Sequence, residues 1–258
     1  MKVSALVNSL PLDLPSAIDQ LADLGFKWID VPPVGAEGES QRRLERRNLR
    51  VTCVALEWGQ PAGMDLASSS DEIRSQTIAY YRGSIDSMHK LGAPVSYLTP
   101  PKATDDGTRR RWIDSLVQLA DHAQQCAVRV CIEHFPGRLL PTVACTLEFL
   151  KQIKHNHLAL LVDVGHCLIS QEDPAQAVSD AGKWLGYVHF DDNDGQNDCH
   201  WALLTGKLTD YQIRDTVRVL RAHDYNGGLC LEFHPDIDDP VNSLRHGKML
   251  LERYVASA

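Results

Sequence analysis

Short apolar runs alternate with amphipathic segments along nearly the whole chain of 258 residues. Each run is four to six residues long and carries apolar side chains at successive positions, which is typical of parallel strands buried on both faces. A segment with apolar residues at helical spacing follows each run. The predicted strands are residues 3–7, 28–31, 51–56, 95–98, 128–132, 158–162, 186–190 and 229–233. This alternation predicts eight β/α units.

Cap signals mark several of the predicted helix ends. Ser69 with Glu72, and Thr209 with Gln212, have the spacing of a capping box, in which each side chain bonds the other residue's backbone N–H group. After three of the predicted helices we expect glycine in a left-handed conformation, because glycine has no Cβ to clash. These glycines are Gly25, Gly92 and Gly227.

Eight β/α units within this length favour a closed barrel over an open sheet. An open doubly wound sheet would carry a glycine-rich phosphate loop after its first strand, whereas residues 8–12 read Asn-Ser-Leu-Pro-Leu. No linker or low-complexity segment divides the chain. The sequence therefore predicts an α/β protein with a single (β/α)8 TIM barrel domain that spans residues 1–258.

Composition and charge argue against several classes of function. The formal net charge is -8, and an acidic chain lacks the basic surface that nucleic-acid phosphates require, so we expect no nucleic-acid partner. No apolar stretch reaches the length of a membrane span, and the first residues lack the features of a signal peptide. The seven cysteines form no C-x-x-C pair, which favours reduced thiols. We therefore expect a cytoplasmic protein that contacts no membrane.

Four ionisable residues fall at the ends of the last four predicted strands: Glu133, Asp163, His189 and Glu232. In a (β/α)8 barrel the carboxyl ends of the strands surround the active site, so these side chains can converge on one point. A lone glutamate at a strand end is usually a salt-bridge partner, and a lone histidine usually belongs to the core. Four in register favour a shared use, because each buried ionisable group costs desolvation energy. A divalent metal ion would use all four.

The ligand types of these four residues limit which metal ion they would bind. Three carboxylates and one imidazole form an oxygen-rich group of ligands. Such a group suits hard divalent cations better than a thiolate-preferring metal. We expect Mn²⁺ first, with Mg²⁺, Co²⁺ or Zn²⁺ as alternatives.

A second polar set lies near the same predicted strand ends. His166 follows the sixth predicted strand, and Asp198 and His200 lie in the loop after the seventh. These three residues could hold substrate hydroxyls, bind another metal ion or belong to a solvated loop. His134 and His234 directly follow the two glutamates, and strand alternation predicts that they point away from the centre.

Three residues could contact a substrate at the rim of the barrel. Glu57 and Trp58 follow the third predicted strand, where the indole could stack on a sugar ring; the alternative is a tryptophan packed at the rim. Arg138 follows Glu133 by five residues and could meet a phosphate or carboxylate group; the alternative is a solvated side chain. The sequence leaves substrate specificity open.

Five segments of the chain resemble the xylose isomerase-like TIM barrel superfamily of sugar and sugar phosphate isomerases and epimerases, which also contains endonuclease IV. They are residues 132–137 (IEHFPG), 161–166 (LVDVGH), 187–195 (YVHFDDNDG), 198–200 (DCH) and 231–232 (LE). The resemblance implies that Glu133, Asp163, His189 and Glu232 are metal ligands. It also implies that Glu133 and Glu232 are the acid/base pair and that His166 contacts substrate.

The reaction implied by this resemblance begins with loss of a proton next to a carbonyl group. A divalent ion bridging the carbonyl oxygen and a neighbouring hydroxyl would stabilise the resulting enediolate. If Glu133 and Glu232 act on opposite faces, one removes the proton and the other returns it, which inverts the carbon. If only one face of the substrate were used for proton transfer, the reaction would be aldose–ketose isomerisation. A leaving group beside the enediolate would make the enzyme a dehydratase or lyase.

Two further functions differ in class from sugar epimerisation. In endonuclease IV, residues that match His166, Asp198 and His200 hold a further zinc ion, and two histidines from the N-terminal half hold another. This chain has Glu57 and Thr99 at the ends of its third and fourth predicted strands, which argues against phosphodiester hydrolysis. A non-catalytic sugar-binding barrel is the other alternative. The identity of the sugar, its phosphorylation and assembly into homo-oligomers are left open by the sequence.

Overall fold

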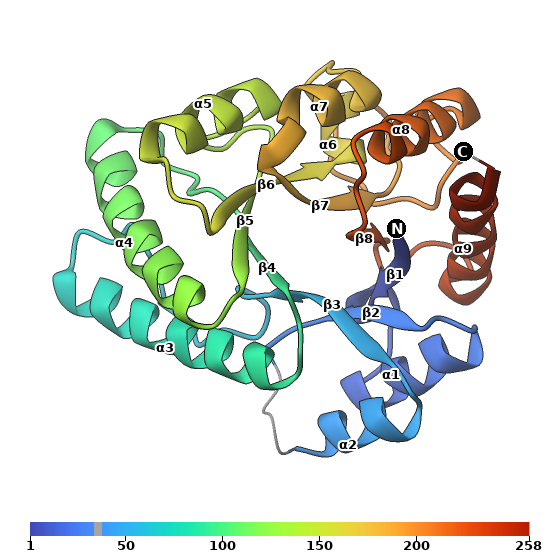
Figure 1. Cartoon of the computed structure of the whole chain (residues 1–258), viewed down its shortest axis with the longest axis horizontal. Helices are drawn as coiled ribbons and strands as arrows, with labels where there is room; N and C mark the ends of the chain where they lie inside the picture. Colours follow the sequence, from blue (N-terminus) through green and yellow to red (C-terminus); the bar gives the residue numbers. More distant parts are fainter. Residues whose placement is uncertain (34–37, 258) are drawn as a thin grey trace.

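The computed structural model describes residues 1–33 and 38–257, and within them eight parallel strands close into a barrel (Figure 1). The strands are β1 (Lys2–Leu6), β2 (Trp28–Val31), β3 (Arg50–Ala55), β4 (Val95–Leu98), β5 (Arg129–Glu133), β6 (Leu158–Asp163), β7 (Leu185–Phe190) and β8 (Gly228–Leu231). Each strand pairs with the next along the chain, and β8 pairs with β1. Every predicted strand overlaps one of these, with ends that differ by at most two residues. The predicted (β/α)8 TIM barrel is therefore confirmed.

The helices form a ring around the barrel and cover the outer faces of the strands (Figure 1). Every strand is followed by at least one helix. The helices are α1 (Leu14–Asp23), α2 (Glu39–Arg46), α3 (Asp71–Lys90), α4 (Asp106–Gln125), α5 (Val143–Ile153), α6 (Val164–Ile169), α7 (Pro174–Ala181), α8 (Asp210–Ala222) and α9 (Pro240–Ser257), with two short 3₁₀ helices, η1 (Val7–Ser9) and η2 (Gly182–Trp184). Among the described residues, none of these helices combines the length and apolarity needed to cross a bilayer.

The structure confirms one predicted capping box and corrects the other. Thr209 precedes α8, and its side chain and that of Gln212 each accept from the other residue's backbone N–H group. The box expected at Ser69 is wrong by one residue. The N-cap of α3 is Ser70, whose hydroxyl accepts a hydrogen bond from the backbone N–H of Ile73 at 3.4 Å.

The glycines predicted to follow helices are required for two different reasons. Gly25 and Gly92 adopt φ values of +79° and +72°, as expected after a helix. Gly227 was expected to do the same, but the left-handed residue after α8 is Asp224, with φ 54°. A Cβ at Gly227 would lie 2.4 Å from the hydroxyl oxygen of Tyr225. Glycine is needed there for space and not for a left-handed turn.

The inside of the barrel is a packed core, as expected for eight strands. Its buried residues are Leu6, Cys53, Ala55, Tyr97, Cys131, Ala159, Leu161, Tyr187 and Cys230. Tyr97 and Tyr187 lie edge-on to the ring of His189, with ring centroids 5.0 and 5.7 Å away. The packed interior thus restricts the imidazole of one predicted site residue.

Candidate metal centre and active site

The structure brings together the four ionisable residues predicted at the strand ends, here called the quartet: Glu133, Asp163, His189 and Glu232. Glu133 and Asp163 are the last residues of β5 and β6, His189 is the penultimate residue of β7, and Glu232 directly follows β8. All four side chains are buried, with exposures between 0% and 8%. One possible ligand atom from each lies within 4.8 Å of the others.

The atoms at the centre of the quartet are close together but poorly satisfied. Nδ1 of His189 lies 3.4 Å from Oε1 of Glu133 and 3.7 Å from Oδ2 of Asp163, and it also contacts Oε2 of Glu232. Nevertheless, Nδ1 of His189, Oδ2 of Asp163 and Oε2 of Glu232 have no partner in hydrogen-bond geometry. Buried polar atoms without partners are costly. Lone pairs that converge in this way fit a divalent cation.

Burial and mutual charge interactions shift the pKa values of all four side chains of the quartet. Burial raises the pKa of Glu133. Burial likewise opposes ionisation of Asp163 and Glu232, but the neighbouring histidines outweigh it and lower the pKa of both carboxyl groups. Burial also disfavours a charged His189, yet the carboxylates of Glu232 and Glu133 outweigh that penalty and raise the pKa of the ring well above its ordinary value. A cation, which requires unprotonated ligands, would replace the proton on His189.

Asp163 serves the local fold as well as the quartet. It is the N-cap of α6, and its Oδ1 accepts a hydrogen bond from the backbone N–H of His166 at 2.7 Å. Its Oδ2 is left for the quartet. The buried ring of His134 packs outside the quartet, with Nε2 3.2 Å from the backbone nitrogen of Asp163. Burial lowers the pKa of His134 to about 3, so a neutral imidazole supports the end of β6.

The structure also brings together the second predicted set, His166, Asp198 and His200. The Nε2 atoms of His166 and His200 lie 3.3 and 3.1 Å from Oδ1 of Asp198. Burial favours a neutral His166, but the charges of Asp163 and Asp198 outweigh it and raise its pKa to about 10. His166 also hydrogen-bonds through Nδ1 to the backbone carbonyl of His134 at 2.9 Å. This set can offer several polar contacts to a substrate.

The sequence analysis assigned no separate role to Asp191, which lies in the polar, turn-like stretch 191–195 after the seventh predicted strand. Asp191 is fully buried, and its Oδ2 lies 2.8 Å from Nδ1 of His200. A Cβ on Gly165 would lie 1.9 Å from Oδ1 of Asp191, so glycine makes room for this carboxyl group. Burial, with the charge of Asp163, raises the pKa of Asp191 to about 7. The available signal was its position, two residues after His189 at the end of β7.

A cavity of about 520 Å³ opens next to both sets. It is lined by Glu57, Trp58, Gly59, Tyr97, Thr99, Glu133, Phe135, Arg138, His166, His200 and Glu232. Most of the predicted catalytic and substrate-binding residues therefore share one space. Asp163 and His189 are buried behind this lining, with exposures of 0% and 1%.

The predicted rim residues are ordered by direct contacts. Oε2 of Glu57 accepts hydrogen bonds from the backbone nitrogen and the hydroxyl of Thr99, at 2.8 and 2.7 Å. Arg138 donates from Nη1 to the same hydroxyl at 2.8 Å, and its guanidinium lies 4.1 Å from the centroid of the Phe135 ring. Trp58 is 38% exposed at the cavity wall. Arg138 is thus held at the rim and is not a freely solvated side chain.

Curated proteins with similar sequences include sugar epimerases. The chain is 29% identical to the D-psicose 3-epimerase of Ruminiclostridium cellulolyticum over 190 residues, which cover 67% of this chain and 61% of that protein. It is 26% identical to the 3-dehydro-D-guloside 4-epimerase of Escherichia coli over 151 residues, which cover 57% of this chain and 54% of that protein. The matched stretch therefore spans less than two thirds of either relative.

Solved structures and a family model extend the similarity to almost the whole chain. A D-tagatose 3-epimerase-like protein has a TM-score of 0.82 at 19% identity, covering 100% of this chain and 98% of that one. The 3-keto-D-glucoside 4-epimerase of E. coli has a TM-score of 0.81 at 20% identity, covering 98% and 99%. The family model described as a xylose isomerase-like TIM barrel matches residues 18–254. This chain belongs to the xylose isomerase-like TIM barrel family.

Proposed function

We propose that this protein is a divalent-metal-dependent sugar epimerase or isomerase that moves a proton on a carbon next to a carbonyl group. The observation that carries the proposal is the quartet, whose buried and unpartnered donor atoms converge beside a cavity of about 520 Å³. The sugar epimerases among the relatives support the same class of reaction. The seven free cysteines agree with a reducing compartment such as the cytoplasm.

Glu133, Asp163, His189 and Glu232 would hold the cation. Three carboxylates and one imidazole suit Mn²⁺ first, with Mg²⁺, Co²⁺ and Zn²⁺ as alternatives. When bound, such a cation supplies Lewis acidity, which makes a hydrogen next to a carbonyl group easier to remove. The remaining chemistry belongs to side chains of this protein.

Glu133 and Glu232 both line the cavity and are the proposed acid and base. One carboxylate accepts the proton from the substrate carbon, and the other, in its protonated form, returns a proton to the opposite face. Without a cation, burial raises the pKa of Glu133, whereas the charge of His189 lowers the pKa of Glu232. A bound cation would favour the ionised form of both carboxyl groups, because metal ligands must be unprotonated.

The cavity wall offers polar groups and an aromatic face to a sugar. Arg138 is the one arginine or lysine among the described residues of the lining, and its Nη1 already donates to the hydroxyl of Thr99. His166, with Asp198 and His200 behind it, would bind hydroxyl groups, and the indole of Trp58 would stack on the apolar face of the sugar.

Hydrogen exchange in heavy water tests this function. The Mn²⁺-loaded protein is incubated in D₂O with a panel of free keto-sugars that includes D-psicose and 3-keto-glucosides, and the sugars are analysed by NMR and mass spectrometry. We expect deuterium on the carbon next to the carbonyl group, together with the epimer. Glu133→Gln should abolish both, and Trp58→Phe, which keeps an aromatic ring, should retain both. Binding without exchange would instead indicate a sugar-binding protein, and loss of water would indicate a dehydratase.

A further inference from the structure

A buried carboxyl group lies inside the barrel next to the quartet. Asp30, the third residue of β2, is 0% exposed. Its Oδ1 accepts hydrogen bonds from the hydroxyl groups of Thr52 at 2.5 Å and of Tyr187 at 2.7 Å. Its Oδ2 is buried without a partner. A carboxyl group that is satisfied on one oxygen only is a costly feature for the core of a barrel.

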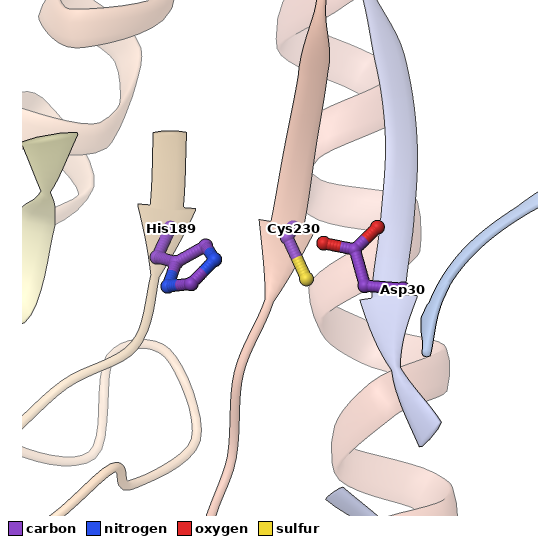
Figure 2. A group of neighbouring side chains, drawn as sticks. All are labelled: Asp30, His189 and Cys230. Atoms are coloured by element: carbon purple, nitrogen blue, oxygen red, sulfur yellow. The ribbon is translucent and has the colours of Figure 1, made fainter. Parts of the chain in front are cut away.

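The carboxyl group of Asp30 lies close to His189 and Cys230. Atoms of Asp30, His189 and Cys230 lie within 4.8 Å of one another. Figure 2 shows the side chains of His189 from β7, Cys230 from β8 and Asp30 from β2 pointing toward one another, with a ring nitrogen of His189 directed at Cys230 and Asp30. The nitrogen that faces the carboxylates of the quartet is Nδ1. The nitrogen directed into the barrel is therefore Nε2.

The chemistry of imidazole links the two sides of this ring. A neutral histidine has one N–H donor and one nitrogen with a free lone pair. If Nδ1 of His189 gives its lone pair to a cation, Nε2 must carry the proton. A buried N–H group needs an acceptor, and Oδ2 of Asp30 is an acceptor that lacks a donor.

We propose that Asp30 is a positioning residue, which orients His189 from inside the barrel and keeps its Nδ1 unprotonated for the metal ion. This inference rests on the proposed function, because it takes His189 as a metal ligand. Metal-bound histidines commonly give their other N–H group to a carboxylate, which fixes the ring and increases its basicity.

Cys230 lies between the two groups without acting as a ligand. Its Sγ lies 3.6 Å from the backbone carbonyl of Leu231. Burial, together with the charge of Asp30, raises the pKa of this thiol well above its ordinary value, so it remains a protonated thiol. Cys230→Ala should therefore leave metal binding largely intact. A thiolate charge-transfer band in the Co²⁺-loaded wild type that is lost in Cys230→Ala would show that Cys230 binds metal and would overturn the proposal.

Mn²⁺ affinity of the full chain, measured by electron paramagnetic resonance of free Mn²⁺, tests Asp30 directly. Asp30→Asn keeps the size of the side chain and removes the carboxylate. We expect a dissociation constant about 10- to 100-fold higher than for the wild type. Thr52→Val is the matched control, because it removes a hydrogen bond to Oδ1 and keeps the carboxylate; its affinity should stay close to that of the wild type. Equal affinities of Asp30→Asn and wild type, or equal losses in both variants, would overturn the proposal.

A measurement on the wild type covers the case in which Asp30→Asn does not fold. Long-range ¹H–¹⁵N NMR of the Mg²⁺-loaded protein, with the His189 signals assigned by their loss in His189→Gln, reports which nitrogen carries the proton. We expect the proton on Nε2. A proton on Nδ1 would overturn the role of Asp30. If the wild type binds neither Mn²⁺ nor Mg²⁺, the proposed function itself fails, and that result is distinct from an Asp30→Asn variant that binds Mn²⁺ as well as the wild type does.

Discussion

Single side chains at the candidate site have a task in the fold as well as the task proposed for them in the chemistry. Asp163 caps α6 with one carboxylate oxygen and offers the other to the quartet. Asp30 receives two hydroxyl groups on one oxygen and leaves the other free. The fold thus fixes each carboxylate through one oxygen, so that the second oxygen is already in place for its partner. Such preorganisation avoids an ordering cost when the ligand binds.

Two substitutions of Asp163 separate these tasks. Asp163→Asn should weaken Mn²⁺ binding and largely retain stability, because asparagine is also a good N-cap. Asp163→Ala should lose the metal ligand and the cap, with an additional loss of about 1 kcal/mol in the free energy of unfolding. Calorimetric titration with Mn²⁺ and urea unfolding of the metal-free proteins measure the two effects. Wild-type Mn²⁺ affinity in Asp163→Asn would remove Asp163 from the metal site.

The space that Gly165 leaves for Asp191 gives a prediction about packing. Gly165→Ala would place a Cβ against the buried carboxyl group of Asp191 and should lower the free energy of unfolding by about 1–3 kcal/mol. Gly83→Ala is the control, because no heavy atom lies within 4 Å of its added Cβ and alanine favours the helix. That variant should be unchanged or stabilised in the same urea experiment. Equal stabilities of the two variants would contradict the proposed crowding at Asp191.

At the scale of elements, the positions of the strands could be predicted much better than the burial of loop residues or the identity of helix caps. Apolar runs between amphipathic segments have few other structures open to them, so all eight strands and the strand-end positions of the quartet follow from the sequence. Loop residues carry no such periodicity. Residues 191–195 are polar and turn-like in sequence, so no periodicity predicts that Asp191 is buried at the end of β7. Before α3, the spacing of Ser69 and Glu72 predicted the cap at Ser69, but the neighbouring Ser70 takes that role.

The corrected start of α3 is itself testable. The hydroxyl of Ser70 accepts a hydrogen bond from the first turn, so Ser70→Ala should cost about 1 kcal/mol of stability. Ser69→Ala should have almost no effect, because Ser69 lies outside the capping interaction. Chemical denaturation of both variants decides between them. A larger loss for Ser69→Ala would restore the capping box expected from the sequence.

At the scale of the whole molecule, closure of the barrel brings together residues that no local pattern connects. Asp30 and Tyr187 are hydrogen-bonded across 157 positions of sequence. The sequence gives Asp30 no motif, since a single aspartate near the end of an early strand has many ordinary uses. The proximity of Asp30 to His189 follows only from the way in which closed strands present side chains to one interior. The quartet was predictable because its residues lie on consecutive strands.

Cation binding should stabilise the entire barrel, because the quartet joins four strands. Mn²⁺ at about 100 times its dissociation constant adds about 2.7 kcal/mol to the free energy of unfolding if it binds only the folded protein. The gain should shrink as the pH falls, because protons compete for the carboxylates and for His189. Calorimetry with Mn²⁺ and with EDTA, at neutral and mildly acidic pH, measures this. His189→Gln should show a much smaller gain, and an equal gain would place the stabilising cation elsewhere.

The central claim is that a single cation is held by side chains from the last four strands of the barrel. X-ray diffraction from crystals grown with Mn²⁺, recorded at the manganese absorption edge, tests it most directly. The account predicts one strong anomalous peak among Glu133, Asp163, His189 and Glu232, bonded to Nδ1 of His189. No peak at the quartet under saturating Mn²⁺, or a peak only at other residues, would contradict it.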